Sequence, residues 1–219
     1  MTAATDPQTS AAELLTRAAV AYARGGDRPA PPDVVEAMLT LERASKRDRG
    51  SNTLSQLLGT WRLAFVTGTQ KTRKRAGKAI GAGRYLPVFP TIHIAYQAAD
   101  AAESSENPGL GRAVNCVAIG SLALTVTGPI EAIAGKRIMA FDFTRWSVGL
   151  GSWTAWRGAI GGGADSEAGF ADRPLSKRPF FNYFWVSETA IAARGKGGGL
   201  AMWVRDDAAK SAIAATPTQ

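Results

Sequence analysis

The residues most able to do chemistry in this chain are basic, and they are concentrated in one region. Residues 49–99 contain no carboxylate, although the 219-residue chain carries 18 Asp and Glu. The same region holds eight bases, which equal the formal net charge of +8. They are Arg49, Arg62, Lys71, Arg73, Lys74, Arg75, Lys78 and Arg84. Because the rest of the chain is electrically balanced, we expect one face of the protein to meet an anionic partner.

Several roles are open for the densest part, Lys71 to Arg84. It could be a solvated surface loop, or it could dock on an anionic membrane, where each base gains about 1 kcal/mol. It could also bind an acidic protein complex, or close over a ligand and bind its carboxylate or diphosphate. Tyr85 and Phe89 would then enter the membrane interface or form part of a lid. No nucleic-acid motif accompanies the charge, and the phosphate-loop pattern is not met, so we do not expect a nucleic-acid partner.

Candidates for enzyme or metal chemistry are few. His93 is the only histidine and Cys116 the only cysteine, so the chain has no internal disulfide and no Cys/His zinc site. His93 lies in an alternating apolar segment that is typical of a strand facing a core, and Cys116 has apolar neighbours. We predict a protein without catalytic residues and without a metal.

The N-terminal part reads as two helices. Residues 1–9 form a polar tail that we expect to be disordered, and the capping-box spacing Ser10 to Glu13 predicts a first helix that ends at Gly25. Apolar residues at helical spacing after Pro32 predict a second helix that ends near Gly50. The predicted organisation is therefore helices over 10–50, a barrel domain over 51–206 and a C-terminal tail over 207–219.

From Leu57 onward the apolar period changes from 3.6 to 2, which indicates strands. Short alternating segments follow one another between turn residues, and the chain closes with a hairpin around 195–199. Such a series predicts an antiparallel barrel. The Gly-rich segment from Trp146 to Pro179 has no sustained period, and we expect it to be a long, partly ordered loop.

The longest nearly apolar run, Cys116 to Val126, is well short of the roughly 20 residues that span a bilayer. The first nine residues have neither the basic nor the apolar part of a signal peptide. We therefore expect an intracellular protein that does not cross a membrane.

The order of several motifs resembles the plastid lipid-associated protein family, also called fibrillins or plastoglobulins. Leu41-Glu42 is followed by Leu57-Leu58-Gly59-Thr60-Trp61-Arg62-Leu63-Ala64-Phe65, which is similar to the family's Leu-x-Gly-x-Trp-Arg-Leu pattern. Later segments that look like its central strands and closing hairpin are 128–143 and 194–205. Ser187 and Ile191 depart from the family's acidic and Arg positions. The resemblance implies a lipocalin-like barrel after two helices, with carotenoid, quinone or prenyl lipid as apolar ligand and no catalytic apparatus.

The Gly-x-Trp element also has a physical rationale of its own. A strand that enters a small barrel can lay the Trp61 indole across its base, where Arg194 or Arg205 from the closing hairpin can cover it. Such a cation-π contact is worth roughly 0.5–2 kcal/mol. Residues that we expect to line a cavity or its lid are Phe65, Tyr85, Phe89, Phe141 and Phe143.

The sequence thus favours a non-enzymatic lipid-, quinone- or pigment-associated protein, peripheral to the thylakoid membrane on its cytoplasmic or stromal side. Two alternatives stay open. One is an assembly or scaffold protein that binds an acidic complex through its basic face. The other is a chromophore-handling protein similar to bilin lyases, some of which share this barrel type.

Overall fold

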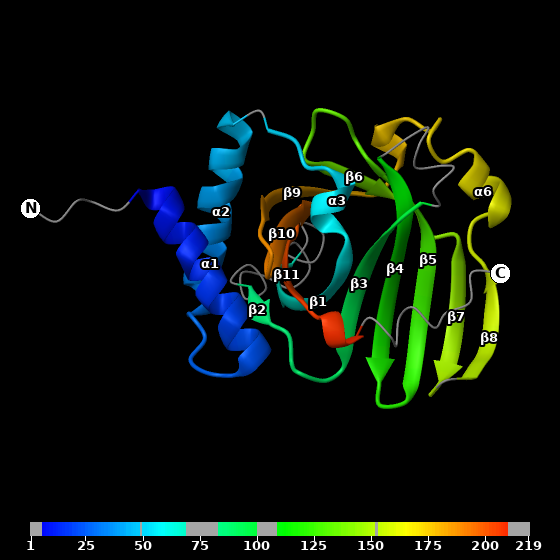
Figure 1. Ribbon diagram of the computed structural model, residues 1–219, viewed down its shortest axis with the longest axis horizontal. Helices are drawn as coiled ribbons and strands as arrows, with labels where there is room; N and C mark the ends of the chain where they lie inside the picture. Colours follow the sequence, from blue (N-terminus) through cyan, green and yellow to red (C-terminus); the bar gives the residue numbers. More distant parts are fainter. Residues whose placement is uncertain (1–5, 49, 69–82, 100–108, 152, 210–219) are drawn as a thin grey trace, which may run out of the picture.

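Two antiparallel helices lie against one flank of a β-barrel in the computed structural model (Figure 1), which describes residues 6–48, 50–68, 83–99, 109–151 and 153–209. They are α1 (Pro7–Arg24) and α2 (Pro31–Arg47). Helix α1 begins three residues before Ser10, because the Asp6 side chain accepts a hydrogen bond from the Gln8 amide and Pro7 suits the first helical turn. The expected tail over 1–9 is therefore too long.

The helices bury an apolar face against the outside of the barrel. Leu15, Met38 and their neighbours pack on outward-facing side chains such as Phe184 and Met202. At the C-terminal end of α2, Glu42 is only 3% exposed and forms a two-pronged ion pair with Arg194, at 2.7 Å to Nε and 2.5 Å to Nη2. This pair ties the helical layer to the barrel at a fixed point.

Eleven strands and a few short helices make up the rest of the described chain. The strands are β1 (Gly59–Val66), β2 (Arg84–Tyr85), β3 (Thr91–Ala98), β4 (Leu110–Ile119), β5 (Leu122–Ala132), β6 (Ile138–Phe141), β7 (Arg145–Leu150), β8 (Trp153–Ala159), β9 (Phe180–Val186), β10 (Ala190–Gly195) and β11 (Leu200–Arg205). The helices are α3 (Leu54–Leu57), α6 (Ala164–Ala168), η2 (Leu175–Lys177) and η3 (Asp207–Ala209).

Eight of these strands close an antiparallel barrel in the order β4-β3-β1-β11-β10-β9-β6-β5, and β5 pairs back with β4. The predicted fold, a lipocalin-like barrel preceded by two helices, is confirmed. β2 pairs only with the end of β1, while β7 and β8 lie outside the barrel.

The barrel divides at strand β5. The second half of β5, Ile130–Ala132, pairs with β6, whereas its first half, Leu122–Thr127, pairs with β7. The change of partner falls at Gly128, where a Cβ would overlap the backbone carbonyl of Asp142. Beyond this fork, β7 and β8 extend the sheet formed by the lower halves of β3, β4 and β5 (Figure 1). We call this extension, together with those half-strands, the wing.

The prediction of a long loop from Trp146 to Pro179 is wrong, since β7, β8, α6 and η2 lie largely within it. Its glycines lie at turns such as 161–163, where φ is positive, and at two strand positions, Gly149 and Gly158; at Gly158 the Trp146 ring leaves no room for a Cβ. These glycines interrupt the apolar-polar alternation of β7 and β8 in the sequence, and the hairpin that these two strands form was therefore not predicted.

The Glu42–Arg194 pair predicts an acid-dependent loss of stability. Burial alone would raise the pKa of Glu42, but the hydrogen bonds and charge of Arg194, aided by Lys46, outweigh burial and lower it. A depressed folded-state pKa stabilises the fold above the ordinary value of 4.5, and this stabilisation is lost as the pH falls through the folded-state pKa. Glu42→Gln should lower the free energy of unfolding at pH 7 by about 2–3 kcal/mol, with a smaller deficit at pH 3.

The measurement is urea unfolding of both proteins between pH 7 and pH 3. Glu36→Gln, at an exposed site on the same helix, is the matched control and should track the parent protein. A deficit for Glu42→Gln that stays constant across this range would contradict the assignment.

Candidate functional site

Trp61 lies inside the barrel under a guanidinium from the last strand. Its indole is fully buried, its Nε1 donates to the Leu57 carbonyl at 2.8 Å, and Arg205 lies 4.1 Å from the ring centroid. Gly59 makes this possible, because its φ is +123° and a Cβ there would overlap the Arg205 guanidinium. The Leu-x-Gly-x-Trp pattern therefore encodes an acceptor for the indole, a gap for a cation and the indole itself.

Of the two arginines expected over Trp61, only Arg205 is there. Arg205 is the register partner of Trp61 on the neighbouring strand. Arg194 lies at the other end of the β10–β11 hairpin, opposite Leu200, and pairs with Glu42 instead. Two segments of the family-like pattern, Leu41-Glu42 and Arg194-Gly195, thus meet in space, a contact that the spacing alone did not indicate.

The barrel interior around Trp61 is packed with rings. Phe141 lies 5.0 Å from Phe181 and 5.3 Å from Phe143, and Phe181 lies 5.3 Å from Trp203, measured between ring centroids. Tyr183 and Tyr96 share a hydrogen bond of 2.5 Å between their hydroxyls, and burial raises the pKa of both. The expected cavity residues Phe141 and Phe143 thus pack against each other and, through Phe141, against Phe181.

The other expected cavity or lid residues lie elsewhere. A register shift between Leu63 and Phe65 turns Phe65 out of the barrel, where it packs under the helices against Tyr85. Tyr85 donates a hydrogen bond to the Pro29 carbonyl at 3.0 Å, so it fastens β2 to the helical layer. Phe89 is 58% exposed in the connection before β3.

Most of the predicted basic site lies outside the described residues. This holds for Lys71, Arg73, Lys74, Arg75 and Lys78, which fall within 69–82. Arg84, the last residue of the group, is exposed on β2.

The strongest surface feature is an apolar face on the wing. Directly paired residues share a face of a sheet, and the row Trp61, Ile94, Asn115, Val126 and Trp146 runs from the barrel interior across to β7. The next rows of paired residues on this face lie beyond the barrel, and their side chains are also apolar. Six of their large side chains are 47–70% exposed, namely Ile119, Leu122, Leu124, Leu150, Trp153 and Trp156.

These side chains gather toward one edge of the wing. The β4–β5 turn, the β7–β8 turn and the connection that leads into β3 all lie at the same end of the sheet, at the bottom of Figure 1. That end therefore carries Leu122, Leu150 and Trp153, and Phe89 lies in the connection that leads into β3; all four are about half exposed or more. Contiguous apolar exposure of this kind marks a binding surface more often than a solvent-facing one. We call the six residues of the previous paragraph the apolar shelf.

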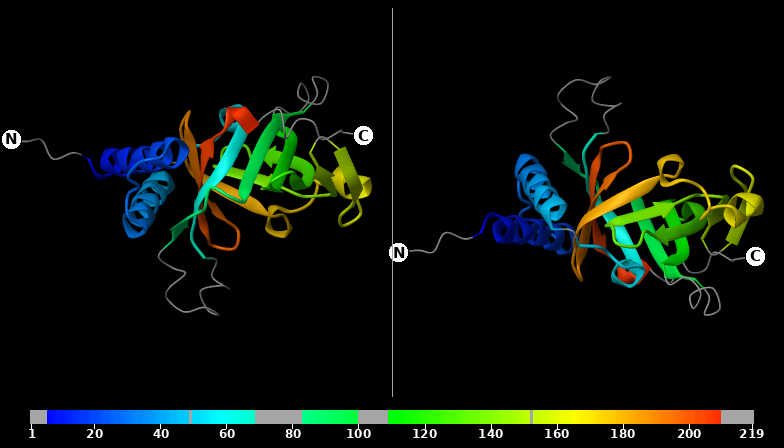
Figure 2. Two further views of the ribbon diagram at one scale, coloured as in Figure 1. Left: turned by 90° about the horizontal axis from the view of Figure 1, so that it is seen from below. Right: turned by 90° about the horizontal axis from the view of Figure 1, so that it is seen from above.

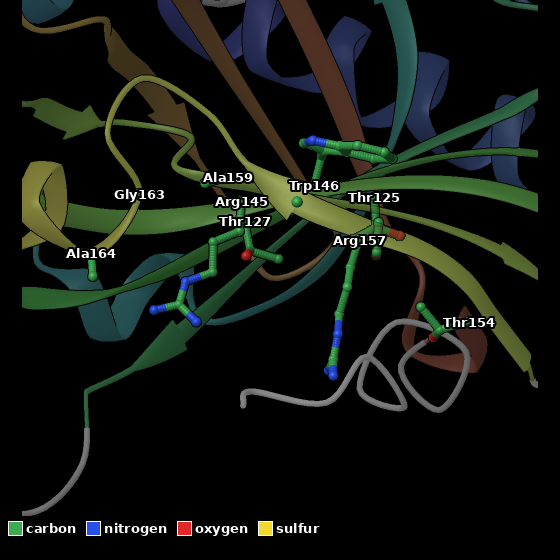
Figure 3. A pocket seen from close by; sticks show the side chains of 11 residues that line it. Thr125, Thr127, Arg145, Trp146, Thr154, Arg157, Ala159, Gly163 and Ala164 are labelled. Carbon is green, nitrogen blue, oxygen red and sulfur yellow. The ribbon is translucent and has the colours of Figure 1, made fainter.

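The opposite face of the wing is polar. Figure 3 shows Arg145 and Arg157 extending from one side of the sheet and the Trp146 indole from the other. Near the fork, Glu167 of α6 accepts from Arg112 and Arg145 at 3.1 Å each and from the Thr144 hydroxyl at 2.5 Å. Burial alone would raise the pKa of Glu167, but these contacts outweigh it and the pKa is lowered. The carboxylate thus stays charged and holds α6 on this face.

His93 also lies on the polar face. Its Nε2 is 3.0 Å from Asp206 Oδ2, and Cys116 is its register partner on β4. Within the described residues no hydrogen bond joins the Cys116 thiol to the His93 ring, so the three side chains do not form a nucleophile-base arrangement.

Comparison with known proteins adds no identity: no protein-family model matches the chain, and no curated protein matches it. In the part of the chain that the structure describes, none of the helices combines the length and the apolar character needed to span a bilayer.

Gly59 allows a test of the Trp61 site. We expect Gly59→Ala to lower the free energy of unfolding by about 2–4 kcal/mol, because it adds backbone strain and displaces the Arg205 guanidinium from the indole. Gly25→Ala is the control, since Gly25 also has a positive φ, but a Cβ there meets no atom within 4 Å. Urea unfolding followed by tryptophan fluorescence measures both variants, and equal losses would show that Arg205 is not constrained by Gly59.

Proposed function

We propose that the protein is a non-enzymatic, lipid-associated barrel that binds peripherally to an anionic membrane surface through its apolar shelf. The observation that carries the proposal is the apolar face of the wing, which continues from the barrel interior and remains exposed. An exposed Trp such as Trp153 or Trp156 suits the boundary between headgroups and acyl chains. The shelf has two, together with aliphatic side chains on the same face.

The charge distribution supports the same proposal. A run of bases in residues 71–84 recruits a protein to anionic lipid over a distance of about a Debye length, and apolar side chains then hold it at the interface. Ligands of the proposed class are carotenoids, quinones or prenyl lipids. Because rings fill the barrel interior around Trp61, we infer that such a molecule contacts the shelf and not the centre of the barrel.

The proposal extends to the family and the compartment. We propose membership of the plastid lipid-associated family, on the Leu57 to Phe65 pattern, and a thylakoid membrane as the anionic surface. The Glu42–Arg194 pair supports this membership, because it gives two separate parts of the family-like pattern a shared structural purpose.

Replacing the two exposed tryptophans tests the proposal. Trp153→Ser combined with Trp156→Ser should weaken binding to vesicles that contain phosphatidylglycerol by at least about tenfold. The reason is that burial of each indole in the interface contributes roughly 2–3 kcal/mol to the binding free energy, and the variant loses both contributions. The thermal midpoint should change little, since the two side chains are 70% and 66% exposed. Sedimentation with vesicles at low and high salt measures the binding.

Val20→Ser combined with Leu39→Ser is the control, because it removes exposed apolar groups from the helices at the opposite end of the molecule (Figure 1). Equal vesicle binding by the tryptophan variant and the parent protein would overturn the proposal. Binding to an acidic protein complex without any affinity for lipid would favour the scaffold alternative, and transfer of a bilin to an acceptor cysteine would favour the lyase alternative.

A further inference from the structure

The polar face of the wing contains a cavity that the proposed function does not use. Its volume is about 350 Å³, and strands β5, β7 and β8 form its floor while residues 163 and 164 form one wall. The chemistry of the lining is distinctive. It includes two arginines and four hydroxyl side chains but no carboxylate, namely Arg145, Arg157, Thr125, Thr127, Ser147 and Thr154.

The sheet register brings these groups together. Ser147 lies between Thr125 and Arg157 in one row, and Arg145 lies between Thr127 and Ala159 in the next. Arg145 and Arg157 are therefore diagonal neighbours on adjacent strands, a separation of about 7–8 Å or less at Cβ. Figure 3 shows both side chains leaving the same side of the sheet, as Thr125, Thr127 and Thr154 do.

The local charge is incompletely compensated. The Glu167 carboxylate accepts from Nε of Arg145 and from Nη2 of Arg112, so one carboxylate pairs with two guanidiniums. Arg157 adds a third cation, and in the described parts of the chain no carboxylate pairs with it. Like charges on neighbouring strands repel each other, and an anion between Arg145 and Arg157 would remove this cost.

We propose that this cavity binds the phosphate or sulfonate group of a small organic anion. A tetrahedral group with three terminal oxygens that share its negative charge matches two guanidinium forks and the surrounding hydroxyl donors better than a carboxylate, which has only two oxygens. The small residues that also line the cavity, Ala159, Gly163 and Ala164, leave room for the organic part of the molecule. The site lies on the face of the wing opposite the apolar shelf, so it is independent of the proposed function.

Calorimetric titration of the full-length protein with inorganic phosphate, sulfate and glycerol 3-phosphate tests this site. The parent protein should bind at least one of them saturably, and Arg157→Gln should weaken that binding by about tenfold, because a charge-assisted pair is lost. Thr154→Val, which removes one hydroxyl, should weaken it by roughly threefold. Thermal unfolding without ligand verifies that the variants are folded, as expected for the exposed Arg157.

Arg17→Gln removes the same charge from an exposed position on α1, outside the wing, and should bind like the parent protein. Unchanged binding in Arg157→Gln, or an equal loss in Arg17→Gln, would overturn the site. The source of the anion is tested with vesicles. Vesicles of phosphatidic acid, whose headgroup is a phosphate monoester, would assign the group to a lipid headgroup if they displace glycerol 3-phosphate, and would assign it to a soluble ester if they leave it bound. The tryptophan double variant should retain phosphate binding, so failure of the shelf and failure of this site are distinguishable.

Discussion

A strand has only two hydrogen-bonding edges, and the division of one edge of β5 determines the architecture of this protein. Along its whole length β5 gives one edge to β4, so its other edge must serve both β6 and β7. The three residues between Phe141 and Arg145 make the change of partner, because β6 can then turn toward β9 and close the barrel while β7 continues outward with β8. Without this fork the barrel would be longer, and no face of the sheet would leave it.

The fork also explains why side chains of interior character become exposed. Alternation along β3, β4 and β5 does not change at the end of the barrel, so the side chains on the same face as Ile94 are apolar in the rows beyond it, where Val117 pairs with Leu124 and Ile119 with Leu122. The helices cannot cover them, because α1 and α2 pack on the flank formed by β1 and β9 to β11 and are fixed there by Glu42 and Arg194. The two helices therefore leave this apolar surface exposed.

The sequence predicted the parts of the structure that depend on local pattern. Alternation and turn residues were sufficient for a barrel after two helices, and the Gly-x-Trp spacing was sufficient to place a cation over Trp61. The failures concern geometry that no single segment contains. The register shift that turns Phe65 outward and the contact of Arg194 with Glu42 depend on how distant strands pair. The wing was missed because its glycines masked the alternation, although Trp153 and Trp156 were a readable signal of an apolar surface. The anion cavity needed the register of three strands and had no contiguous motif.

Two contributions would hold such a wing at a membrane: the attraction of bases to anionic lipid and the burial of apolar side chains. Their relative size decides which of them dominates. The six bases of residues 71–84 gain up to about 6 kcal/mol beside anionic lipid at low salt, but ionic screening removes much of this at high salt. Burying about 100 Å² of each exposed indole gains roughly 2–3 kcal/mol, and the aliphatic neighbours add to it, with little dependence on salt. Charge would thus govern how fast and how selectively the protein arrives, whereas the apolar shelf would govern what remains bound when ions are added. Because the two terms respond to different conditions and belong to different segments of the chain, one of them can be removed while the other is retained.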